Sequence, residues 1–245
     1  MNKKYNYIEK GEGEAVILLH GLMGAVSNFE STLEKLPKFG YRVILPMLPL
    51  YSLPVLKTNV NKLADFINNF IDDLQIKKCT LLGNSLGGHI GLILALRKPN
   101  IVKRLILSGS SGLYENTLGG KFPRRGSYDY IKEKTEEVFY NPQKATKNLV
   151  DEVFEIVNNK EKLIRVLMMA KSAIRHNMKA DLPKIKQKTC IIWGKNDIVT
   201  PPKVGMEFHE EIPNSELFWI DKCGHAPMIE KPDEFNKILV EWLNK

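Results

Sequence analysis

Short apolar runs alternate with longer amphipathic stretches along most of the chain. Six runs are rich in leucine, isoleucine, valine or aromatic residues, as expected for strands buried on both faces: Ala15–His20, Tyr41–Leu45, Cys79–Leu82, Arg104–Leu107, Cys190–Trp193 and Leu217–Ile220. Strands of this kind are typical of parallel sheets. The pattern therefore predicts a mostly parallel sheet.

Between these runs, apolar residues recur at helical spacing. In Thr58–Leu74, for example, Leu63, Ile67 and Phe70 fall on one stripe. The stretches with this pattern are Asn28–Phe39, Thr58–Leu74, Leu86–Lys98, Pro202–Glu211 and Pro232–Leu243. Strands that alternate with helices predict an α/β fold with helices on both faces of the sheet.

The alternation stops after Gly112 and resumes after Pro183. In between, Asp151–Val157 and Leu163–Ile174 are amphipathic, and Gly119–Ser127 has the composition of an exposed turn. We therefore expect a core made of residues 1–112 and 183–245, with a helical subdomain, residues 113–182, inserted into it.

The composition of the 245 residues is that of an ordinary globular protein. With 43% hydrophobic and 26% charged residues, the chain does not resemble disordered, collagen-like or coiled-coil sequences. No apolar stretch approaches the ~20 residues that cross a bilayer. Because Met1–Lys10 is not followed by the apolar segment of a secretory signal, we expect a cytoplasmic protein without a membrane span.

Charge and cysteine content exclude several classes of site. The net charge is +8, but the lysines are dispersed apart from the cluster Lys121–Arg125, so we expect no nucleic-acid partner. Cys79, Cys190 and Cys223 are widely spaced, which predicts free thiols. The five histidines form no HExxH motif, and we expect neither a metal nor a cofactor.

The segment Gly83–Gly87 (GNSLG) matches the motif G-x-S-x-G. It follows an apolar run and opens a helical stretch, which is the strand–turn–helix context of a nucleophile elbow. In such a turn, side chains two residues before or after the serine collide as the strand folds into the helix, so glycine is required there. The motif predicts Ser85 as a nucleophile.

A serine hydroxyl needs a base to take its proton, and the base needs a carboxylate to fix its tautomer. His225 follows the last predicted strand in the loop DKCGHAP, which suits the chain order serine, acid, histidine. Asp197 lies just after the run CIIW, where the loops of an open α/β sheet gather. Asp221 and Glu230 are rivals of Asp197 because they are close to His225 in sequence.

The tetrahedral intermediate needs two hydrogen-bond donors for its oxyanion. Hydrolases of this pattern supply the backbone N–H of the residue after the nucleophile and one from a loop after an early strand. We expect Leu86 to be the first donor and Leu22 the second, with Met23 as the next choice. His20 is expected to hydrogen-bond the backbone of the same loop.

The early HG loop, GNSLGG, WGKND and CGH, in this order, resemble the motifs of the α/β-hydrolase fold superfamily. The resemblance implies a mostly parallel sheet, a Ser-Asp-His triad, no cofactor and an inserted helical cap. Asn84 and the CGH motif are also similar to hydrolases that cleave carbon–carbon bonds in ring-fission products of aromatic compounds. Ala226 departs from the tryptophan usual there, and Arg165 and Arg175 are not clear counterparts of their cap arginine.

These features predict a serine hydrolase, and we expect a carboxylesterase acting on a small to medium ester. Met23, Asn84, Met168 and Met169 are the candidate substrate-binding residues, since thioethers adapt to irregular ligands. Carbon–carbon bond hydrolysis, cofactor-free perhydrolysis and ligand binding without turnover remain alternatives. The sequence leaves the natural substrate and the oligomeric state open.

Overall fold

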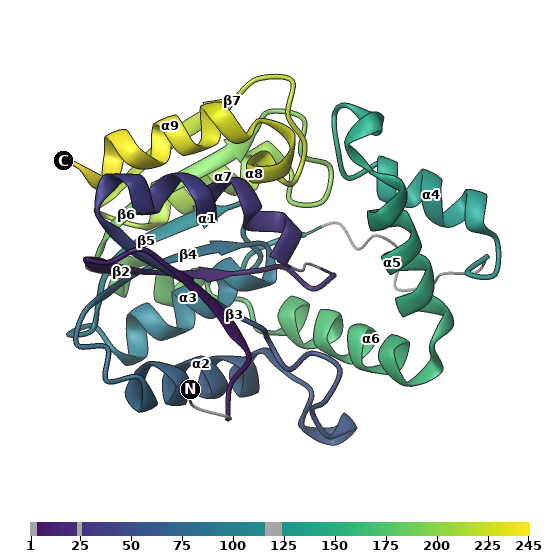
Figure 1. Ribbon diagram of the computed structural model, residues 1–245, viewed down its shortest axis with the longest axis horizontal. Coiled ribbons are helices and arrows are strands. Elements are labelled where there is room, and N and C mark those ends of the chain that lie inside the picture. Colours follow the sequence, from purple (N-terminus) through teal and green to yellow (C-terminus); the bar gives the residue numbers. More distant parts are fainter. Residues whose placement is uncertain (1–3, 24–25, 116–123) are drawn as a thin grey trace.

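The computed structural model describes residues 4–23, 26–115 and 124–245 (Figure 1). All six predicted runs form strands of one sheet. They are β2 (Glu14–Leu19), β3 (Tyr41–Pro46), β4 (Cys79–Asn84), β5 (Val102–Ser108), β6 (Lys188–Gly194) and β7 (Ser215–Ile220). Their pairings are parallel, in the order β3-β2-β4-β5-β6-β7, which confirms the predicted α/β class.

The apolar pattern does not predict the edge strand β1 (Tyr7–Lys10). It pairs antiparallel with β3, with Tyr7 opposite Pro46 and Lys10 opposite Val43. This strand is short and only partly buried, so it carries no continuous apolar run. The sheet therefore has seven strands among the described residues, in the order β1-β3-β2-β4-β5-β6-β7.

Helices cover both faces of the sheet, as its alternating side chains require. In β2, Ile17 and Leu19 belong to one hydrophobic cluster, whereas Val16 and Leu18 belong to the other. The first cluster includes buried residues of α2 (Val60–Asp73), α3 (Leu86–Arg97) and α7 (Pro202–Glu211). The second includes those of α1 (Glu30–Lys35), α8 (Pro227–Glu230) and α9 (Pro232–Leu243). Figure 1 shows α2 and α3 on one side of the sheet and α1 and α9 on the other.

The helix expected at Asn28–Phe39 is divided into three pieces. The 3₁₀ turns η1 (Val26–Phe29) and η2 (Leu36–Phe39) flank the short helix α1. Pro37 has no N–H to donate to the carbonyl four residues earlier, so a continuous α-helix cannot run through it. The predictions for α7 and α9 agree with the structure at both ends.

The segment between β5 and β6 is helical in its described part. It contains α4 (Tyr128–Glu136), η4 (Pro142–Lys144), α5 (Lys147–Asn158), α6 (Lys160–Arg175) and η5 (Lys179–Lys184). The turn expected at Gly119–Ser127 lies outside the described residues over 119–123, and residues 124–127 are exposed. Figure 1 shows α4, α5 and α6 grouped beyond one end of the strands, and we refer to them as the α4–α6 segment.

The remaining turn, η3 (Val55–Lys57), lies between β3 and α2 and contacts α6. None of the described helices combines the length and the apolar character that a bilayer crossing requires.

Candidate active site

Ser85 occupies the turn between β4 and α3, with φ = 53° and ψ = −119°. A non-glycine residue rarely adopts this conformation, which is a form of local strain common at functional sites. A Cβ at Gly83 would lie 2.3 Å from the backbone of Gly87, and one at Gly87 would lie 1.9 Å from the carbonyl oxygen of Leu19. The two glycines are therefore sterically required, as the motif predicts.

Backbone hydrogen bonds fix the strained turn to the end of β5. The N–H of Ser85 donates to the carbonyl of Ser108 at 3.1 Å, and the carbonyl of Ser85 accepts from the N–H of Ser111 at 3.1 Å. These bonds determine the position of Ser85 at the carboxyl edge of the sheet.

The structure brings His225 and Asp197 together. His225 Nδ1 lies 2.9 Å from Asp197 Oδ2, although the two residues are 28 positions apart in the sequence. Asp197 is 2% exposed and His225 is 7% exposed. Asp197 Oδ2 also accepts a hydrogen bond from the Thr200 hydroxyl at 2.8 Å. This arrangement has the geometry that a histidine–carboxylate pair adopts in a catalytic triad.

The surroundings of His225 favour its protonated form. Burial lowers the pKa of His225, but the charge of Asp197, the hydrogen bond to it and the charge of Glu115 all raise that pKa. The net pKa lies above the ordinary value for histidine. The site therefore stabilises the imidazolium that forms when a histidine takes a proton from a serine.

Gly109 is required beside this pair, and the sequence motifs do not identify it. Its φ is +50°, and a Cβ there would lie 3.0 Å from His225 Nδ1 and 3.2 Å from Asp197 Oδ2. A side chain would thus press against both partners of the hydrogen bond. The only signal in the sequence is the position of Gly109 directly after an apolar strand.

Asn84 lines the cavity, and its side-chain NH₂ group donates hydrogen bonds to backbone carbonyls. Asn84 Nδ2 donates to the carbonyls of Ser108 at 3.0 Å and His225 at 3.2 Å. Both N–H groups of the amide are therefore occupied. Asn84 therefore connects the nucleophile turn to the histidine loop, and its assignment as a substrate-binding residue stays a prediction.

The rival carboxylates Asp221 and Glu230 contact groups other than the His225 imidazole. Asp221 has a side chain that is 69% exposed and lies 3.5 Å from Lys195 Nζ. Glu230 is buried and accepts backbone hydrogen bonds from Gly224 at 2.6 Å, Asn141 at 2.6 Å and Tyr140 at 3.2 Å. Glu230 thus links the loop before His225 to the chain that follows α4.

We predict that Glu230→Ala lowers the free energy of unfolding by about 3 kcal/mol or more. The substitution leaves the buried N–H of Gly224 and the part-buried N–H groups of Tyr140 and Asn141 without their acceptor, and an unsatisfied buried group costs ~1–3 kcal/mol. Chemical denaturation of wild type and variant measures the difference. Glu234→Ala, at an exposed position of α9, is the control. Equal stability of the Glu230 variant and wild type would contradict this role.

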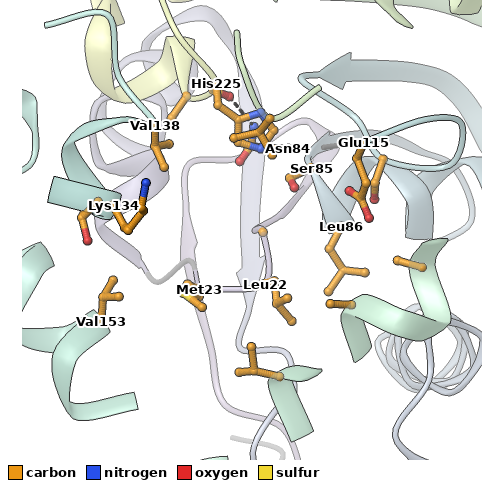
Figure 2. Close-up of a pocket in the computed structure, with 18 of the residues that line it drawn as sticks. Leu22, Met23, Asn84, Ser85, Leu86, Glu115, Lys134, Val138, Val153 and His225 are labelled. Carbon is orange, nitrogen blue, oxygen red and sulfur yellow. Dashed lines mark hydrogen bonds between the residues drawn. The ribbon is translucent and has the colours of Figure 1, made fainter. Parts of the chain in front are cut away.

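A cavity of ≈ 460 Å³ lies between the Ser85 turn and the α4–α6 segment. Ser85, His225, Leu22, Met23 and Leu86 line it, together with apolar residues of α4, α5 and α6. Figure 2 shows Leu22 between Met23 and Leu86. Its volume is within the range of small-molecule sites.

The expectation for Met168 and Met169 is wrong in placement. The residues of α6 that line the cavity are Val166, Leu167, Ala170, Lys171, Ala173 and Ile174. Met169 is 1% exposed and belongs to the same hydrophobic cluster as α2 and α3. Successive residues of a helix point about 100° apart, so one turn of α6 contributes both to the cavity and to the core.

The motifs do not identify six polar residues of the described cavity lining: Asn28, Ser111, Glu115, Lys134, Thr135 and Lys171. Glu115 follows β5, Lys134 belongs to α4, and Asn28 lies at the end of the early loop. No recognisable motif surrounds any of them. Glu115 and Asn28 do, however, lie shortly after buried strands, where site residues of open α/β sheets gather.

His89 and Cys223 are buried in the protein core. His89 is fully buried on α3, and its Nε2 lies 2.9 Å from His176 Nδ1 at the end of α6. Burial and the charge of His176 lower the pKa of His89 to about 3. Cys223 is also fully buried, and burial raises the pKa of its thiol, so it is not available as a thiolate nucleophile.

His20 is also buried, and it was expected to hydrogen-bond the backbone of the early loop. His20 is 3% exposed, its Nδ1 lies 2.9 Å from the carbonyl oxygen of Gly21, and its Nε2 accepts from the N–H of Leu48 at 3.2 Å. These contacts connect the early loop to the segment after β3.

Comparisons with known proteins agree with this arrangement. Residues 14–151, more than half of the chain, match the model of a family described as the alpha/beta hydrolase fold. A solved structure, MGS-MChE2, an alpha/beta hydrolase enzyme from the metagenome of sediments of the Mar Chica lagoon in Morocco, is 45% identical. It has a TM-score of 0.83, and the match covers 100% of this chain and 96% of that one.

Two similar proteins come from Comamonas testosteroni. One, a 2-hydroxy-6-oxo-6-phenylhexa-2,4-dienoate hydrolase, is 30% identical, and the match covers 98% of this chain and 91% of that protein. The other, a 2-hydroxy-6-oxononadienedioate/2-hydroxy-6-oxononatrienedioate hydrolase, is 31% identical, with coverage of 99% and 92%. The similarity therefore extends over nearly the whole length of each protein.

Proposed function

Because this chain belongs to the α/β-hydrolase fold family, we propose that it is a serine hydrolase that cleaves a carbon–carbon bond next to a ketone. The single observation that carries the proposal is that the elbow serine and His225, which is hydrogen-bonded to Asp197, line one cavity, in a chain similar end to end to dienoate hydrolases. A 2-hydroxy-6-oxo-6-phenylhexadienoate contains a ketone and no ester, so its hydrolysis breaks a carbon–carbon bond.

In the proposed mechanism Ser85 attacks the carbonyl carbon, and His225 Nε2 takes the hydroxyl proton. The N–H groups of Leu22 and Leu86 stabilise the oxyanion of the tetrahedral intermediate. The bond to the leaving carbon then breaks, the proton passes from His225 to that carbon, and Ser85 remains acylated. A water molecule, deprotonated by His225, hydrolyses the acyl-enzyme.

We further propose that residues 113–182 act as a cap over the Ser85 site. The described part of this segment supplies a large share of the apolar cavity lining, including Ile131, Val153 and Leu167. It also supplies Lys134, whose pKa is raised by its hydrogen bond to Glu137, and the exposed Lys171. The Lys171 ammonium group is available to pair with a substrate carboxylate, and Lys134 would share its ammonium group between the substrate and Glu137.

Ester hydrolysis is the second candidate, and the lining of the cavity favours it. No arginine is among the described lining residues. The Arg165 guanidinium instead donates hydrogen bonds to the carbonyls of Leu53 and Glu161, each at 2.9 Å. Arginine binds carboxylates through two parallel hydrogen bonds, which a lysine cannot reproduce. A neutral ester does not need such a group.

The deciding experiment compares kcat/KM for 2-hydroxy-6-oxo-6-phenylhexa-2,4-dienoate with kcat/KM for p-nitrophenyl butyrate. We expect the dienoate to be preferred by about tenfold or more, which corresponds to ~1.4 kcal/mol of transition-state binding. Loss of the dienoate absorption and release of p-nitrophenol follow the two reactions. A preference for the ester would replace the first proposal with the second.

A further inference from the structure

Among the described residues that line the cavity, Glu115 is the one carboxylate, and the mechanism does not use it. Glu115 lines the cavity seven residues after the end of β5. Figure 2 shows its carboxyl group on the same side of the site as Ser85 and Leu86. Among the described residues, no hydrogen bond to this carboxyl group is present, and its electrostatic partner is His225.

A basic and an acidic side chain of the cavity lie on opposite sides of Ser85. Figure 2 shows Lys134 and Val138 on one side of Ser85 and Glu115 on the other. Lys134 lies on α4, where its Nζ donates to Glu137 at 2.5 Å, and Lys171 is exposed on α6. Lys171 thus places a positive charge on the α6 side of the cavity, whereas Glu115 places its carboxyl group beside Leu86.

We propose that Glu115 selects substrates by their charge. A substrate with one carboxylate binds with that group towards the lysines, whereas a substrate with carboxylates on both sides of the scissile ketone is disfavoured. This inference rests on the proposed carbon–carbon bond hydrolysis. A phenyl-substituted dienoate carries one carboxylate, whereas a nonadienedioate carries two, one at each end. In either orientation, one carboxylate of the dianion lies on the Glu115 side.

Like charges within a cavity repel strongly because little water separates them. For two unit charges ~8 Å apart, at an effective dielectric constant of ~20, the repulsion energy is large enough to lower kcat/KM by more than tenfold. Burial raises the pKa of Glu115, and the smaller opposing effect comes from His225. Above that pKa the Glu115 carboxylate is ionised, and its repulsion of dianions reaches full strength.

The test measures kcat/KM for both dienoates in wild type, Glu115→Gln and Glu210→Gln at pH 8. Glutamine keeps the size of the side chain and removes its charge. We expect the ratio of dicarboxylate to monocarboxylate turnover to rise about tenfold in Glu115→Gln. Glu210, exposed on α7 and outside the cavity lining, is the matched control for the loss of one negative charge.

An unchanged ratio in Glu115→Gln, or the same change in Glu210→Gln, would overturn the inference. If wild type cleaves neither dienoate, the proposed function fails, and the charge rule is tested on esters of 4-hydroxybenzoate. The butyrate carries one carboxylate and the hemisuccinate carries two, on opposite sides of the scissile carbonyl. The same tenfold rise is expected there, and the absence of turnover with all four compounds would overturn both proposals.

Discussion

Ser85→Ala is expected to lower kcat by about 10⁶-fold, the size of effect seen when a serine nucleophile is removed from a triad. Without the hydroxyl oxygen, no acyl-enzyme forms, and only oxyanion stabilisation and substrate binding remain. These contribute ~10³–10⁴ over the uncatalysed reaction. Steady-state and single-turnover assays with the preferred substrate measure the loss.

The variant should fold normally, because Ser85 makes its structural contacts through the backbone. Its N–H and carbonyl bond Ser108, Ser111 and His89, and alanine keeps all of these bonds. A midpoint of chemical denaturation close to that of wild type would show that the loss of activity is chemical. Turnover near the wild-type rate would remove Ser85 from the mechanism, and with it the proposed function.

The parts of the site that could be predicted from the sequence are those in which sterics allow only one residue type. The nucleophile turn needs glycine at positions 83 and 87, since a Cβ at either meets backbone atoms at 2.3 Å or less. Such a requirement leaves a visible motif. The sheet is predictable for a similar reason, because strands buried on both faces must be apolar throughout.

Other parts could not be predicted because their signal is not local. The hydrogen bonds that Glu230 accepts come from residues as far as 90 positions away in the sequence. Nothing in the neighbouring sequence distinguishes it from a carboxylate that faces solvent. The direction of the Met168 and Met169 side chains depends on how α6 is rotated against α2, which helical periodicity alone does not specify.

The same contacts couple the α4–α6 segment to His225. The N–H of His225 donates to the carbonyl of Val138 at 2.9 Å, and Val138 also lines the cavity. Glu230 joins Tyr140 and Asn141 to Gly224, one residue before His225. A shift of the chain after α4 would therefore move the His225 backbone as well as the cavity wall.

Asp197 is held so that only one of its oxygens can serve the histidine. Oδ1 accepts the backbone N–H groups of Val199 at 2.8 Å and Thr200 at 2.9 Å, which leaves Oδ2 towards His225 Nδ1. In an asparagine at this position, the amide oxygen must keep the two backbone donors. The NH₂ group is then placed where Oδ2 was, facing the imidazole.

Asp197→Asn is therefore expected to lower kcat by about 10⁴-fold while the fold stays intact. The asparagine NH₂ donates to Nδ1, so the imidazole proton moves to Nε2, which can no longer accept the Ser85 proton. Asp221→Asn is the matched control, because its exposed carboxylate pairs only with Lys195 among the described residues and should leave kcat within about twofold. Measured kcat values for both variants decide between the two acids: a large loss in Asp221→Asn with normal turnover in Asp197→Asn would assign the role to Asp221.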